Sequence, residues 1–125
     1  MAITYTDAVK VARMNAVITA AGAAAVLEIG TTGMASILAT FALANPIGSS
    51  AGAGVMTLDF DPDISDTSAD NSGTAAEARI RTASDGTDII TGMTVGTSGA
   101  DVVLDSVSIT AGQTVTITAG TITHA

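Results

Sequence analysis

Residues 6–22 carry apolar side chains at three- and four-residue spacing, which is the period of an amphipathic helix. The positions that form one apolar stripe are Val9, Ala12, Ala16, Val17, Ala20 and Ala21. Thr6 can cap the start of this helix, Asp7 suits its first turn, and Gly22 suits its end. Because the stripe is rich in alanine, we expect the helix to lie close against a sheet.

From residue 25 onward the apolar positions alternate with polar ones, which is the period of β-strands. The expected strands cover residues 27–29, 37–43, 55–60, 76–82, 89–95, 102–109 and 114–123. Asn45-Pro46 is expected to end the second strand, Asp85-Gly86 to form a hairpin turn, and Gly120 to mark a bulge. The pattern predicts a mainly β fold, an antiparallel β-sandwich or barrel of seven to eight short strands with one N-terminal helix.

The length of 125 residues fits a single domain, with the helix over about 6–22 and the β-sandwich over about 25–123. Aromatic residues make up only 2% of the chain, so its core depends on Val, Ile, Leu, Met and Ala. Small side chains contribute less apolar burial per position, and we therefore expect a homo-oligomer that gains stability by association.

The composition also excludes several classes of protein. The chain has no cysteine, which excludes disulfides, thiolate metal sites and a cysteine nucleophile. Its net charge of −8 has the wrong sign for a nucleic-acid binder. No run of about 18 apolar residues predicts a membrane span. Lys10 and Arg13 before an alanine-rich run could suggest a signal peptide, but Asp7, Asn15 and Gly22 favour the amphipathic helix.

The acidic segment over residues 61–74 contains the main candidate for a metal site. Asp59, Asp61, Asp63 and Asp70 occupy positions 1, 3, 5 and 12 of a calcium-loop template. The match fails where Ile64 replaces the turn glycine and where Asp70 replaces the usual glutamate. We therefore expect a solvated surface loop and no metal cofactor, with Ca²⁺ bound by these four residues as the alternative.

Residues for catalysis are scarce. His124 is the only histidine and Lys10 the only lysine, so we expect no catalytic residues and a protein that is not an enzyme. The glycine-rich segments 48–54 and 96–99 lack the pattern of a phosphate-binding loop and are expected to be ordinary loops. Arg79 and Arg81, which share a strand face with Glu77, allow three interpretations: a solvated face, a salt bridge to a neighbouring subunit, or nucleic-acid binding.

Three segments resemble a known family. The opening over residues 8–17 with its continuation over 25–29, the strand over 37–43 ending at Asn45-Pro46, and the close over 104–117 are similar to small structural proteins encoded among the head genes of tailed bacteriophages. The similarity covers about half of the chain and involves packing and turn residues. The middle of the chain, including the acidic segment, departs from the family pattern.

The resemblance implies a virion structural protein, and in particular a capsid cement or decoration protein that bridges subunits of the major capsid protein. The net charge of −8 favours the outer capsid surface, because packaged DNA of the same sign would repel the chain from the interior. A head–tail connector or tail structural protein is an alternative. A calcium-dependent carbohydrate or cell-surface binding module is an alternative of a different class.

Overall fold

A computed structural model describes residues 3–50, 55–60, 65–83 and 86–123 of the chain. Its first element is α1 (Asp7–Ala21), which begins where the Oγ1 atom of Thr6 accepts a hydrogen bond from the Val9 N–H. The helix ends at Gly22, whose φ of 75° lies in the region that favours glycine. The predicted helix and both of its caps are therefore confirmed.

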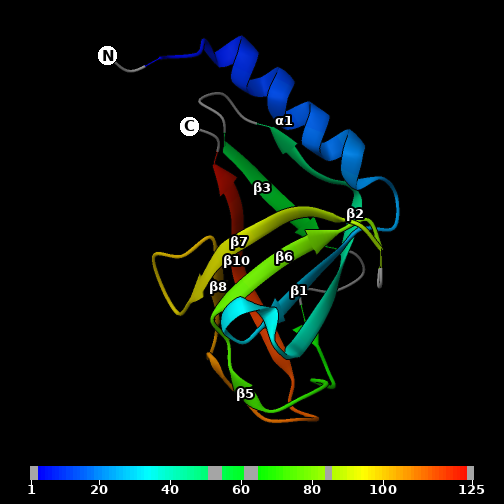
Figure 1. The fold of residues 1–125 in the computed structure, drawn as a ribbon, viewed down its shortest axis with the longest axis vertical. Coiled ribbons are helices and arrows are strands. Elements are labelled where there is room, and N and C mark those ends of the chain that lie inside the picture. Colours follow the sequence, from blue (N-terminus) through cyan, green and yellow to red (C-terminus); the bar gives the residue numbers. More distant parts are fainter. Residues whose placement is uncertain (1–2, 51–54, 61–64, 84–85, 124–125) are drawn as a thin grey trace.

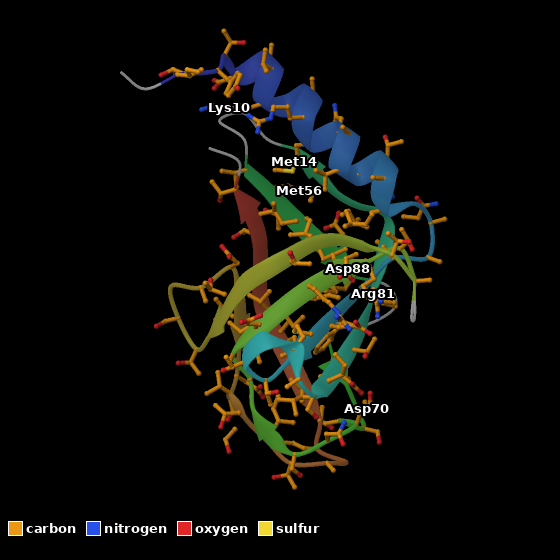
Figure 2. All side chains as sticks on the ribbon, in the orientation of Figure 1. Lys10, Met14, Met56, Asp70, Arg81 and Asp88 are labelled. Atoms are coloured by element: carbon orange, nitrogen blue, oxygen red, sulfur yellow. The ribbon has the colours of Figure 1, made fainter. Side chains whose placement is uncertain are left out.

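The face of α1 that packs on the barrel differs from the predicted one. Met14 and Ala21 are buried, and Val11 and Ile18 are half-buried. The members of the predicted stripe that are exposed are Val9, Ala12, Ala16 and Ala20. The predicted stripe was thus wrong for most of its length, because the helix turns its bulkier apolar side chains inward. Figure 2 shows Met14 and Met56 at the same end of the molecule, and both belong to the hydrophobic core.

Within the described part of the chain, seven strands close into a barrel, as Figure 1 shows. In chain order they are β1 (Val26–Gly30), β2 (Ile37–Ser50), β3 (Val55–Phe60), β6 (Glu77–Arg81), β7 (Asp88–Gly96), β8 (Val102–Leu104) and β10 (Val115–Thr123). Around the barrel the order is β3-β2-β1-β6-β7-β8-β10, and pairing of β10 with β3 completes it. The mainly β class and the barrel alternative are confirmed. Since one sheet closes on itself, the strands do not form a two-sheet sandwich.

The strand pairing departs from the antiparallel prediction at one place. β7 and β8 are parallel and pair only through Val95 with Val102 and Gly96 with Val103. The predicted strand over 102–109 is also divided, because β8 ends at Leu104 and a separate short strand, β9 (Ser108–Ile109), follows it. The other pairings of the barrel are antiparallel.

Bulges let the longer strands curve around the barrel. Asn45-Pro46, a cis peptide, does not end β2 as predicted, and the register with β3 instead shifts between Leu43 and Gly48. Gly48 therefore belongs to a strand, whereas residues 51–54 of the predicted glycine loop lie outside the described residues. In β10 the register shifts between Ile117 and Ala119, close to the bulge that Gly120 predicted.

The end of the barrel opposite α1 is closed by short segments. β4 (Ser65–Asp66) extends the sheet beside β10, and β5 (Gly73–Thr74) pairs with β9. A short 3-10 helix, η1 (Thr32–Met34), connects β1 to β2. Figure 1 shows β5 at this end and α1 at the other, so the apolar core lies between them inside the barrel.

Candidate functional site

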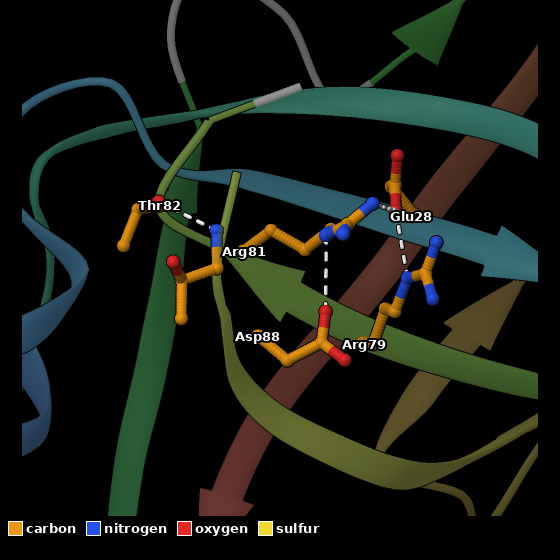
Figure 3. A network of polar contacts seen from close by, with 6 residues as sticks. Glu28, Arg79, Arg81, Thr82 and Asp88 are labelled. Carbon is orange, nitrogen blue, oxygen red and sulfur yellow. Dashed lines mark hydrogen bonds and ion pairs between the residues drawn. The ribbon is translucent and has the colours of Figure 1, made fainter. Parts of the chain in front are cut away.

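Four charged residues form an ion-pair network on the outer side of β1, β6 and the start of β7 (Figure 3). Arg79 Nε donates a hydrogen bond of 2.7 Å to Glu28 Oε1, and Arg81 Nη1 lies 3.7 Å from the same oxygen. Arg81 Nε lies 3.0 Å from Asp88 Oδ1 in an ion pair whose geometry is not that of a hydrogen bond. Strand register explains the arrangement, because Glu28 stands opposite Arg79 and Arg81 opposite Asp88.

The network is largely withdrawn from water. Glu28 is 5% exposed, and the Arg79 and Arg81 side chains are 19% and 21% exposed. Two cations and two anions balance one another within it, so these groups join three neighbouring strands of the same chain. The arginines are therefore not freely solvated, because Glu28 and Asp88 of the same chain pair with them.

The four candidate calcium ligands are not all described. Asp59 is exposed on β3 and Asp70 is exposed at the far end of the barrel, as Figure 2 shows for Asp70. Asp61 and Asp63 lie outside the described residues. Among the residues that the structure does describe, no group of three or more acidic or histidine side chains is placed to hold a metal ion.

The described part of the acidic segment, residues 65–74, is bound to the barrel and is not a freely solvated loop. Asp66 accepts hydrogen bonds from the N–H groups of Thr40 and Ser68, each at 3.0 Å. The Asp70 N–H donates to the Leu38 carbonyl at 2.8 Å. Ala69 is buried, and it exchanges backbone hydrogen bonds with residues 112 and 113. This segment closes the end of the barrel, and one alanine in a polar run was the only sequence feature that pointed to that role.

The remaining candidates of the sequence analysis are dispersed. His124 and the Ser84-Asp85 half of the predicted hairpin turn lie outside the described residues. Lys10 is half-buried on α1. The predicted loop over 96–99 begins at the last residue of β7, and Gly99 adopts a positive φ of 64°. These residues do not converge on one site in the described structure.

The exposed apolar surface of the described residues gathers at the N-terminus. The large hydrophobic side chains that face solvent are Ile3, Tyr5 and Val9, which are 82%, 44% and 41% exposed. The guanidinium carbon of Arg13 lies 4.8 Å from the centroid of the Tyr5 ring, which is within the range of a cation–π contact. Figure 1 shows this end of α1 extending beyond the barrel. The alternation of Ile3 and Tyr5 with threonines is the sequence feature that could have indicated this exposed apolar segment.

The barrel wall has a shallow hollow of about 140 Å³ between β7 and the end of β10. It is lined by residues 90–93 of β7, by Asp101 and by residues 121–123 of β10. Asp101 is held against β7, because its carboxylate accepts from the Thr94 N–H at 3.0 Å and its own N–H donates to Thr94 Oγ1 at 2.9 Å. The Asp101 carbonyl also accepts from the Thr121 N–H at 2.9 Å. Asp101 thus ties β7 to β10 where the barrel is most weakly paired.

Comparisons of the chain with protein-family models, with curated proteins and with solved structures found no match. None of the helices within the described residues is long and apolar enough to cross a membrane.

Proposed function

We propose that the chain is a non-enzymatic virion structural protein, a capsid cement or decoration protein that bridges subunits of the major capsid protein on the outer surface of a tailed-phage head. The proposal starts from the resemblance of residues 8–17, 25–29, 37–43 and 104–117 to small proteins of phage head genes. The alternative is a head–tail connector or tail component, which is also a virion structural protein but lies in a ring of the neck or tail.

The outer face of α1 is the observation that carries the proposal. Val9, Ala12, Ala16 and Ala20 are all exposed, while Met14 on the opposite face anchors the helix to the barrel. Small side chains let another protein approach the helix closely, and an exposed apolar surface is typical of an interaction site. A rigid barrel that presents such a helix is suited to bridging subunits by buried surface, which requires more than about 1,000 Å² in total for a stable contact.

The charges of the barrel support a position on the outer surface. The chain after Gly22 has eleven acidic residues and two arginines, and both arginines are matched by Glu28 and Asp88. The remaining acidic groups repel packaged DNA and favour solubility at the exterior.

The contact surface can be tested by adding charge to the outer face of α1. Ala12→Glu/Ala16→Glu keeps good helix-forming residues at two exposed positions, so we expect normal folding. Capsid occupancy should fall at least tenfold, which corresponds to about 1.4 kcal/mol of binding free energy. A matched control is Thr74→Glu, which adds charge at an exposed position at the far end of the barrel. Equal occupancy for both variants would remove α1 from the proposed interface.

The calcium-dependent alternative has a separate test. It requires a melting temperature that rises with Ca²⁺, returns to its starting value with EGTA, and no longer rises in the variant Asp61→Asn/Asp63→Asn. The cement proposal predicts that the melting temperature does not respond to Ca²⁺.

A further inference from the structure

We propose that residues 3–6 of one copy of the chain add as a β-strand between β7 and β10 of a second copy. The proposal does not rest on a role in the capsid, because it concerns the association of the chain with itself.

The barrel has an open seam between β7 and β10. β7 pairs with β8 only through Val95 and Gly96, so the preceding part of β7 has β6 as its only described strand partner. Residues 121–123 of β10 pair with β3 on one side, and β8 begins beside Gly120 on the other side. No described strand lies between these two stretches, and the hollow of about 140 Å³ separates them.

The seam presents backbone groups that can pair with a strand. The Thr121 N–H points toward the β8 side, where it donates to the Asp101 carbonyl. Because alternate residues of a strand direct their N–H and C=O groups to the same side, Thr123 directs its groups into the seam. The neighbouring side chains Ile90 and Ile122 are half-buried and offer apolar contact. Strand edges of this kind are the usual sites of strand addition.

Residues 3–6 have the properties of a strand that could fill this seam. Ile3 and Tyr5 alternate with Thr4 and Thr6, and all four residues are exposed. Thr6 already has extended backbone angles, with φ −68° and ψ 158°. Isoleucine, tyrosine and threonine favour strands, and four residues extend over about 13 Å. Added to the seam, the segment would direct Ile3 and Tyr5 to one face, where Ile90 and Ile122 lie.

The charges of the two parts favour the contact. The first 22 residues carry one acid, Asp7, against the two bases Lys10 and Arg13. The rest of the chain carries eleven acids against two arginines, and those arginines already face Glu28 and Asp88. Opposite net charges of the N-terminal segment and the barrel attract two copies that would otherwise repel each other at −8 each.

We assign the segment to a second copy because α1, which packs on β2 and β7 of its own barrel, projects the segment beyond that barrel. The 15 residues of α1 extend over about 22 Å, and Figure 1 shows the first turn of the helix beyond the barrel while its last turn meets β2. Exchange of such a terminal strand between copies produces a dimer when it is reciprocal and a ring when it runs head to tail.

The first experiment is disulfide trapping between two differently tagged copies, which is specific because the chain has no cysteine of its own. One copy carries Thr4→Cys, whose side chain would lie on the face of the added strand opposite Ile3, and the other carries Thr91→Cys, an exposed position that lines the seam. We expect a mixed disulfide in several-fold higher yield than with the matched control Thr74→Cys, which is exposed at the far end of the barrel. Equal yields for the two acceptor positions would overturn the proposal.

The mass of the purified chain in solution is the second measurement. We expect at least twice the mass of one chain, and a shift to the monomer in the variant Ile3→Asp/Tyr5→Asp. Thr4→Asp is the matched control, because its side chain would lie on the opposite face of the added strand, and it should retain more of the assembly. A monomeric wild-type chain, or an intrachain disulfide in a monomeric chain carrying both cysteines, would contradict addition to a second copy. Neither measurement uses capsids, so its outcome is separate from that of the cement proposal.

Discussion

Substitution of Glu28 by glutamine tests whether the buried ion pairs hold the barrel wall together. The change keeps the shape of the side chain and one oxygen acceptor, but it removes the negative charge that faces Arg79 and Arg81. The two arginines stand two residues apart on one face of β6, so their guanidinium groups would then repel each other. We expect a less stable protein with the same fold.

The magnitude follows from the geometry of the network. Attraction between unit charges about 4 Å apart is worth about 4 kcal/mol at an effective dielectric constant near 20. Removing one partner of a fully buried pair costs about 3–5 kcal/mol. Water reaches both guanidinium groups here, since their side chains are about one-fifth exposed, and this solvation reduces the cost. We therefore predict a loss of about 2–3 kcal/mol in the free energy of unfolding, below the range of a fully buried pair.

Asp88→Asn is the matched control within the same network. The Asp88 side chain is 44% exposed, so its ion pair with Arg81 is screened by water, and its loss should cost only about 0.5–1 kcal/mol. Urea unfolding followed by far-ultraviolet circular dichroism measures both values, at one protein concentration because self-association would add to stability. A loss for Glu28→Gln that is no larger than that for Asp88→Asn would refute the reasoning.

Three further substitutions, two of them paired with a control substitution, test other parts of the fold by the same unfolding measurement. Gly48→Ala should destabilise the protein by more than about 1 kcal/mol, because the added Cβ would overlap the Thr57 carbonyl, whereas Gly96→Ala meets only ordinary contacts and should be nearly neutral. Met14→Ala should lower the free energy of unfolding by about 2–4 kcal/mol, because Met14 is buried, and Val9→Ala should lower it by less than about 0.5 kcal/mol. The reverse order would indicate that the helix packs through the face that the sequence predicted. Asp101→Ala should lower the free energy of unfolding by about 0.5–1.5 kcal/mol, because it removes the hydrogen bond to the exposed Thr94 N–H, and an unchanged stability would show that Asp101 does not secure β7.

The helix shows which features local sequence determines. Its bounds were predictable because Thr6 and Gly22 act on neighbouring backbone groups. Its buried face was not predictable, since two apolar stripes share the same helix and the helical spacing of apolar residues does not choose between them. The stripe containing Val11, Met14 and Ile18 has the larger side chains, and comparing side-chain volumes would have identified it.

Strand positions were predicted better than strand partners. Alternation located β3, β6 and β10, because a strand with one face in the core shows its period directly. It gave no information on neighbours, so the parallel pairing of β7 with β8 and the closed barrel could not be derived. Pro46 was overinterpreted as the end of a strand, because proline is compatible with a strand at a bulge.

The ion-pair network could not be predicted for the same reason, because it depends on which strands are neighbours. Alternation correctly placed Arg79 and Arg81 on the outer face of their strand, and a solvated face was one of three interpretations left open on that basis. Glu28 is 51 positions before Arg79 in the sequence and meets it only because β1 and β6 pair. The sequence could therefore suggest which residues are charged and face outward, but not that they face one another.

The most direct test of the proposed function is the number of copies of this chain per copy of the major capsid protein in purified virions. The cement proposal predicts a ratio between one to one and one to three, as expected for a protein that covers the contacts between capsid subunits. A ratio of a few per hundred would assign the chain to the neck or tail, and its absence from the particles would contradict the virion proposal altogether.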